Sequence, residues 1–89
     1  MTRQVKTRVG TIRGALTRAA FMQGFREARR GLPMDYEAFT GPGETNSRWQ
    51  YERGRQFAIV FAGDVKRGSR VTYEAESAFR EAYYERLIR

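Results

Sequence analysis

The feature that most constrains this fold is an apolar stripe that repeats every three to four positions between residues 20 and 32. Its members are Ala20, Phe21, Gly24, Phe25, Ala28 and Leu32. This spacing places them along one side of an α-helix, and that side must pack against another part of the chain. Gly31 and Pro33, which come next, are residue types that end helices. The pattern predicts a first helix from about Thr11 to Arg30.

A second helix is predicted from a capping box, in which Ser47 is followed three residues later by Gln50. We expect this helix to begin at Ser47 and to end near Gly63. The apolar run 57–62 would by itself also suit a buried strand, but the helical start upstream favours a helix. The face that we assign to the core carries Trp49, Phe57, Val60 and Phe61.

A last helix is predicted to follow Thr72, whose side chain suits an N-cap, with Glu74 and Glu76 placed near the helix N-terminus. Its expected apolar face carries Ala75, Ala78, Phe79, Ala82, Tyr83 and Leu87. Residues 40–46 and 63–70 have the composition of polar turns. The predicted fold class is therefore mainly α, with a helical hairpin over residues 11–63 and a C-terminal helix over 72–89. Because the chain has only 89 residues, we expect one small domain.

Two glycines interrupt the predicted helices on the edges of their apolar stripes. Gly24 lies in the first helix and Gly54 in the second. A glycine inside a helix costs about 1 kcal/mol relative to alanine. Both positions therefore indicate a close approach between helices, where a side chain would not fit.

The charge of the chain is strongly segregated. The formal net charge is +7, and the first 30 residues hold eight Lys and Arg side chains with a single acidic one. Residues 31–89 hold nine of each sign. A concentrated positive charge favours polyanionic partners, which are nucleic acid, an acidic protein surface or anionic lipid.

The N-terminal segment 1–10 allows two interpretations. Val5, Thr7 and Val9 alternate with polar or charged residues, which suits a short strand. A basic arm that becomes ordered on a partner fits as well, and we favour it.

The candidate nucleic-acid-binding residues lie in this arm, on the arginine face of the first helix and in the segment "ERGR" of the second. They are Arg3, Lys6, Arg8, Arg18, Arg26, Arg29, Arg30, Arg53 and Arg55. We expect the arginine face to meet phosphates and, being exposed, to contribute little to stability.

The segment "ERGR" also has a plainer interpretation. On a helix, Glu52 can pair with Arg48 or with Arg55, which would make a solvated row of salt bridges. Arg53 differs, because it projects near the apolar stripe between Trp49 and Phe57. It either extends past these rings to solvent or stacks on Trp49.

The stretch "RAAFMQGFREARRG", a proline and a tyrosine soon after it, and then "RW" opening a glycine-containing helix together resemble the ribosome modulation factor family. The matching positions are Arg18, Ala19, Phe21, Gly24, Phe25, Gly31, Pro33, Tyr36, Arg48, Trp49 and Gly54. The resemblance covers about half the chain. It departs from the family where Cys-Pro-Tyr becomes "LPMDY" and where a C-terminal helix is added. It implies a small basic helical hairpin that binds small-subunit ribosomal RNA and modulates translation.

Other function classes find little support in the composition. The chain has no Cys and no His, so thiolate ligands and the commonest general base are missing. We expect no enzyme activity, catalytic residue, metal site, cofactor or small-molecule substrate. No apolar run reaches the length of a membrane span, and no secretory signal is recognisable, so we expect a cytoplasmic protein. The alternative to RNA binding is a small phage-type inhibitor that binds a host protein or nucleoprotein complex.

Overall fold

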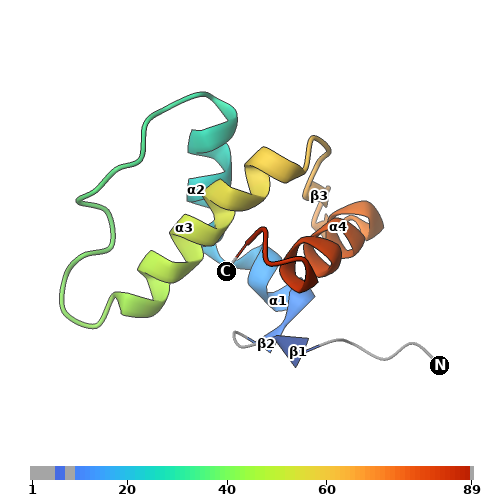
Figure 1. Ribbon diagram of the computed structural model, residues 1–89, viewed down its shortest axis with the longest axis horizontal. Coiled ribbons are helices and arrows are strands. Elements are labelled where there is room, and N and C mark those ends of the chain that lie inside the picture. The colour runs from blue at the N-terminus through green and yellow to red at the C-terminus, as the bar shows by residue number, and fades with distance from the viewer. Residues whose placement is uncertain (1–5, 8–9, 89) are drawn as a thin grey trace.

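The protein is mainly helical, as predicted (Figure 1). The computed structural model describes residues 6–7 and 10–88, and this part of the chain contains four helices and two short antiparallel hairpins. The helices are α1 (Ile12–Thr17), α2 (Ala19–Arg29), α3 (Thr45–Val60) and α4 (Tyr73–Tyr84). The strand pairs are β1 (Lys6–Thr7) with β2 (Gly10–Thr11) and β3 (Lys66–Arg67) with β4 (Arg70–Val71). The connection between α2 and α3 swings out from the body of the molecule.

The prediction of a single helix from Thr11 to Arg30 is wrong, because the helix is interrupted at Arg18. This residue has an extended backbone, with φ −67° and ψ 137°, and separates α1 from α2. On one continuous helix Leu16 and Phe21 would point about 140° apart. The break turns both side chains into the same core, where each is 0% exposed.

Helices α2 and α3 pack in very close contact at the two glycines. A Cβ atom on Gly24 would overlap the carbonyl oxygen of Tyr51 and lie 3.0 Å from its carbonyl carbon. A Cβ atom on Gly54 would overlap the carbonyl oxygen of Phe21 and lie 2.8 Å from its carbonyl carbon. The expected close approach at Gly24 and Gly54 is therefore confirmed, and it is a contact of backbone against backbone.

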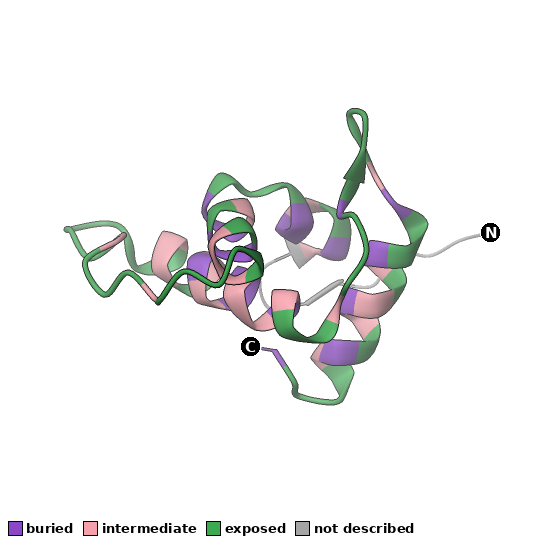
Figure 2. Cartoon of the chain, turned by 90° about the horizontal axis from the view of Figure 1, so that it is seen from above, coloured by how far each residue is buried: buried purple, intermediate pink, exposed green. Residues whose placement is uncertain are grey.

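Four phenylalanines fill the centre of the core. Phe21, Phe25, Phe57 and Phe79 have neighbouring ring centroids 5.6–6.5 Å apart. They come from α2, α3 and α4, and α1 adds its own buried side chains. In Figure 2 the buried segments of the helices face one another, while the connection between α2 and α3 is almost entirely exposed.

The second helix is displaced from its predicted position at both ends. Helix α3 begins at Thr45, two residues before Ser47, and its N-cap Glu44 follows a turn in which the Glu44 amide donates to Gly41. The helix ends at Val60 and not near Gly63, because Phe61 is extended. The glycine-containing turn thus sets the start of the helix, and the predicted capping box does not.

The face of α3 that enters the core also differs from the prediction. Phe57 is buried and Phe61 half-buried, as expected, but Trp49 is 39% and Val60 42% exposed. Tyr51 takes their place and is fully buried. The buried face is centred on Gly54, since the glycine contact with α2 fixes how α3 is rotated.

The last helix has the predicted start and an earlier end. The Thr72 hydroxyl accepts a hydrogen bond from the Ala75 amide, which confirms the N-cap. Helix α4 ends at Tyr84, so the expected continuation to residue 89 is wrong. Arg86 adopts a positive φ of 59° and reverses the chain. As a result the expected core residue Leu87 is 52% exposed and Ile88 is buried instead.

The polar segment before α4 forms the hairpin β3–β4. Gly68, with φ +65°, is the first residue of its two-residue turn, a position where hairpins favour glycine. The base of the hairpin is anchored by Val65, which is 3% exposed, and by the Thr72 hydroxyl, which donates to the Asp64 carbonyl at 2.7 Å. The hairpin therefore has a fixed position, in which β4 contacts α1.

Candidate nucleic-acid interface

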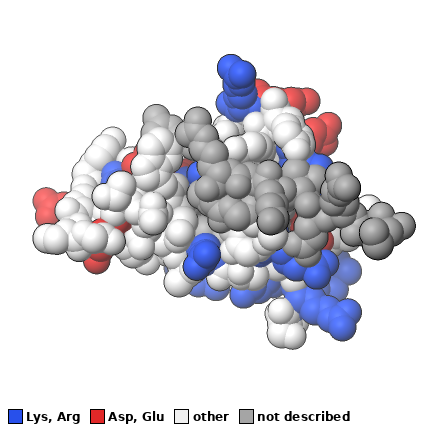
Figure 3. Space-filling view, turned by 90° about the horizontal axis from the view of Figure 1, so that it is seen from below, with Lys and Arg blue, Asp and Glu red and all other residues white. Residues whose placement is uncertain are grey.

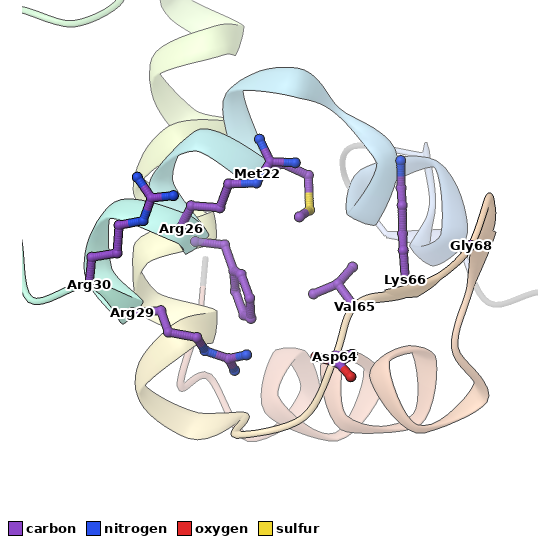
Figure 4. Close-up of a pocket in the computed structure, with 9 residues that line it drawn as sticks. Met22, Arg26, Arg29, Arg30, Asp64, Val65, Lys66 and Gly68 are labelled. Atoms are coloured by element: carbon purple, nitrogen blue, oxygen red, sulfur yellow. The ribbon is translucent and has the colours of Figure 1, made fainter.

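An open groove of about 550 Å³ lies between α2 and the hairpin β3–β4. Met22, Phe25 and Val65 supply its apolar part, and Figure 4 shows the arginines of α2 on one side and Lys66 on the other. We call this feature the basic groove. It forms because the anchored hairpin brings residues 64–68 opposite residues 22–30.

Positive charge dominates the lining of the basic groove. Arg26 and Arg29 come from α2, Arg30 is the residue that follows α2, and Lys66 comes from β3. Asp64 is the one carboxylate among the described lining residues. All five side chains are exposed. Across the surface seen in Figure 3, most basic side chains gather along one edge, and acidic ones show mainly at the left end and upper right.

Arg29 differs from its neighbours because its guanidinium group is held in place. Nη1 donates to the Gly63 carbonyl at 2.7 Å and Nη2 donates to the Phe61 carbonyl at 2.6 Å. The guanidinium carbon also lies 4.3 Å from the centroid of the Phe25 ring. Arg29 thus fastens the end of α3 to α2, so the expectation that it contributes little to stability needs correction.

Arg55 makes contacts within the protein. It lies 3.5 Å from a Glu27 carboxylate oxygen and donates to the Leu32 carbonyl at 2.7 Å. Arg48 forms the predicted pair with Glu52 at 2.9 Å. Of the two pairings open to Glu52, the structure thus shows the one with Arg48.

Arg48 and Tyr51 together fasten the connection between α2 and α3. The Arg48 guanidinium donates to the carbonyls of Asp35 and Ala38, each at 2.8 Å. The Tyr51 hydroxyl accepts from the Asp35 amide at 2.9 Å and donates to Glu27 at 2.6 Å. Burial raises the pKa of the Tyr51 hydroxyl above its ordinary value of 10.0, and the hydrogen bond to Glu27 raises it further.

Arg53 is buried, with 3% of its surface exposed. It therefore does not extend to solvent, which was one of its two expected arrangements. A buried guanidinium is inaccessible to a phosphate group on a partner.

The structure brings only some of the predicted binding residues close together. Arg26, Arg29 and Arg30 share the basic groove. Arg18 is exposed at the junction of α1 and α2. Lys6 belongs to β1, so the strand interpretation holds for this short part of the segment. Arg3 and Arg8 lie outside the described residues.

Sequence reasoning missed the cations of the hairpin. Lys66, Arg67 and Arg70 are all exposed on β3 and β4. Counting charge over the whole of residues 31–89 concealed them, because acidic residues elsewhere balance them. The local signal was "VKRGSRV", in which basic residues flank a Gly-Ser turn.

Comparisons with known proteins give no relative for this chain: no family model, curated protein or solved structure matches it. Within residues 6–7 and 10–88, no helix is long and apolar enough to cross a membrane. The same residues contain no group of three or more carboxylate, His or Cys side chains arranged to hold a metal ion.

Proposed function

We propose that this protein binds nucleic acid, with structured RNA favoured, through the basic groove. The observation that carries the proposal is the convergence of cations from two distant segments: Arg26 in α2 with Arg30 directly after it, and Lys66 from β3. Exposed Arg and Lys side chains attract phosphate groups, and such contacts supply most of the sequence-independent affinity for nucleic acids. The hairpin residues Arg67 and Arg70 extend the same positive charge beyond the groove.

The preference for RNA rests on the resemblance of residues 18–54 to ribosome modulation factors. Those proteins bind small-subunit ribosomal RNA, so the proposal extends to modulation of translation. Of the positions that carry the resemblance, Gly24 and Gly54 have a clear structural role at the crossing of α2 and α3. That role supports a shared helical hairpin.

The test is a salt titration of binding to a ribosomal RNA hairpin and to a DNA duplex. The groove variant is Arg26→Gln with Arg30→Gln, and the control is Arg80→Gln with Arg86→Gln near the end of α4. Each double variant removes two positive charges. For every phosphate that the protein no longer neutralises, the slope of log affinity against log salt should fall by about 0.9 on duplex DNA. We expect the groove variant to lose affinity and slope, and the control to resemble the parent.

Equal losses from both double variants would contradict the assignment of binding to the groove. An absence of binding by the parent at moderate salt would overturn the proposal altogether. If a nuclease-treated lysate then yields a stoichiometric partner protein whose binding needs Arg26 and Arg30, the inhibitor alternative replaces RNA binding.

A further inference from the structure

The fixed arginine of the basic groove has a geometry that suits a nucleobase better than a phosphate. One face of the Arg29 guanidinium covers the Phe25 ring, and two of its nitrogens already donate to the carbonyls of Phe61 and Gly63. Two of its nitrogens are therefore already engaged within the protein. Arg29 is nevertheless exposed and lines the groove, so a ligand in the groove can reach it.

A planar guanidinium is a surface on which nucleobases stack. Most exposed arginines must lose side-chain freedom before they can act in this way, which reduces affinity. Arg29 is already held by its two carbonyl bonds and by the Phe25 ring. The fixed group thus offers a base a prepared stacking surface at little further cost in entropy.

The remaining groove residues complete a site for one nucleotide. Arg26 and Arg30 continue along α2 beside Arg29, and Lys66 lies on the opposite side (Figure 4). All three are exposed and can meet a phosphate. Met22 adds apolar surface that the edge of a base or sugar can contact.

The size of the groove suits a single nucleotide. Its volume of about 550 Å³ falls within the range of roughly 300–1,000 Å³ that is typical of sites for a single small molecule. We propose that the basic groove binds one unpaired nucleotide of an RNA, with its base stacked on Arg29 and its flanking phosphates on Arg26, Arg30 and Lys66. This inference rests on the proposed function and specifies the part of the RNA that is recognised.

The test compares three RNA hairpins of the same stem: one fully paired, one with a single-nucleotide bulge, and one whose bulged nucleotide lacks its base. The last two carry the same phosphates, so electrostatic attraction alone predicts equal affinity. We expect the bulged RNA to bind the unaltered protein roughly 5- to 100-fold more tightly than the abasic one, as for the loss of one base stack. The comparison needs no protein variant and so does not depend on whether a variant folds.

A variant then assigns the effect to Arg29. Arg29→Lys keeps the charge and removes the planar group, so bulged and abasic RNAs should bind it with similar affinity. Melting of Arg29→Lys is measured first, and binding is compared at a temperature where it is folded. Equal binding of all three RNAs by the parent, with a salt slope that still depends on Arg26 and Arg30, would overturn the nucleotide site and leave nucleic-acid binding intact. Failure to bind any of the three would overturn both.

Discussion

Replacing Gly24 by alanine should destabilise the protein, although alanine is the better helix former. Helix propensity alone would favour Gly24→Ala by up to about 1 kcal/mol. The added methyl group, however, would overlap the Tyr51 carbonyl oxygen and lie 3.0 Å from the carbonyl carbon. Both atoms belong to the backbone of α3, so no side-chain rotation can relieve the overlap.

The expected size of the effect follows from the distance that the helices must move. An ordinary contact needs 3.4–4 Å, so α2 and α3 must separate by on the order of 1 Å in a core that packs like a crystal. Overpacking of this kind costs about 1–3 kcal/mol. After the gain in propensity we expect Gly24→Ala to lose about 1 kcal/mol, or roughly 4–8 °C in Tm for a domain of this size.

Thermal and urea melts followed by circular dichroism measure this loss. Gly41→Ala is the control, because a Cβ atom added at Gly41 would lie 3.8 and 3.9 Å from its nearest neighbours, two atoms of the Glu44 side chain. It should change stability little. Gly54→Ala should resemble Gly24→Ala, and the double variant should lose less than the sum, since one separation of the helices relieves both overlaps. A Tm for Gly24→Ala at or above that of the parent would refute the reasoning.

Three further predictions concern side chains outside the crossing. Arg29→Ala should lower the free energy of unfolding by about 1–2 kcal/mol in urea melts, because two charge-assisted hydrogen bonds to carbonyls disappear. Arg26→Ala should lower it by almost nothing, and equal losses would contradict this role of Arg29. Tyr51→Phe should lose about 1–2 kcal/mol and expose the connection between α2 and α3 to limited proteolysis. Because the folded-state pKa of Tyr51 is raised, the parent should lose stability as pH rises above about 10, and urea melts of Tyr51→Phe should lack that part of the decline. Arg86→Gly should gain about 0.5–1 kcal/mol in thermal melts, since φ is 59° there, and a lower Tm would contradict this.

Several local signals in the sequence were informative, although the capping box at Ser47 was not. Thr72 caps α4, and Gly31 ends α2 with the Leu32 amide donating back to the Glu27 carbonyl at 2.9 Å. Gly24 and Gly54 also indicated a close helix contact, because glycine is unfavourable inside a helix unless packing requires it. These features depend on a few neighbouring residues or on a cost that packing must offset.

The break at Arg18 was also readable, although the prediction missed it. On a continuous helix, Ile12, Ala15 and Leu16 would lie on one side and the stripe that contains Phe21 and Phe25 on the opposite side. One core can receive both stripes only if the helix breaks. By contrast, nothing local shows that α3 buries Tyr51 and leaves Trp49 half exposed. The rotation of α3 depends on its contact with α2.

The candidate interface was predictable only in part. The arginine face of α2 was found, because helical periodicity gathers Arg26, Arg29 and Arg30. The hairpin's Lys66 could not be placed opposite them, since that depends on how residues 64–72 fold back. The different role of Arg29 depends on two carbonyls more than 30 positions away in the chain, a relation that periodicity cannot reveal.

The interruption of the helix at Arg18 also affects which part of the protein unfolds first. Helix α1 has six residues, too few to be stable alone in water, and its contacts include α4 as well as α2. Helices α2 and α3 contact each other directly through their backbones, and neither α1 nor α4 takes part in this contact. Amide hydrogens of α1 should therefore exchange with solvent early, through local undocking, whereas those around the glycine crossing should exchange only when the whole molecule unfolds.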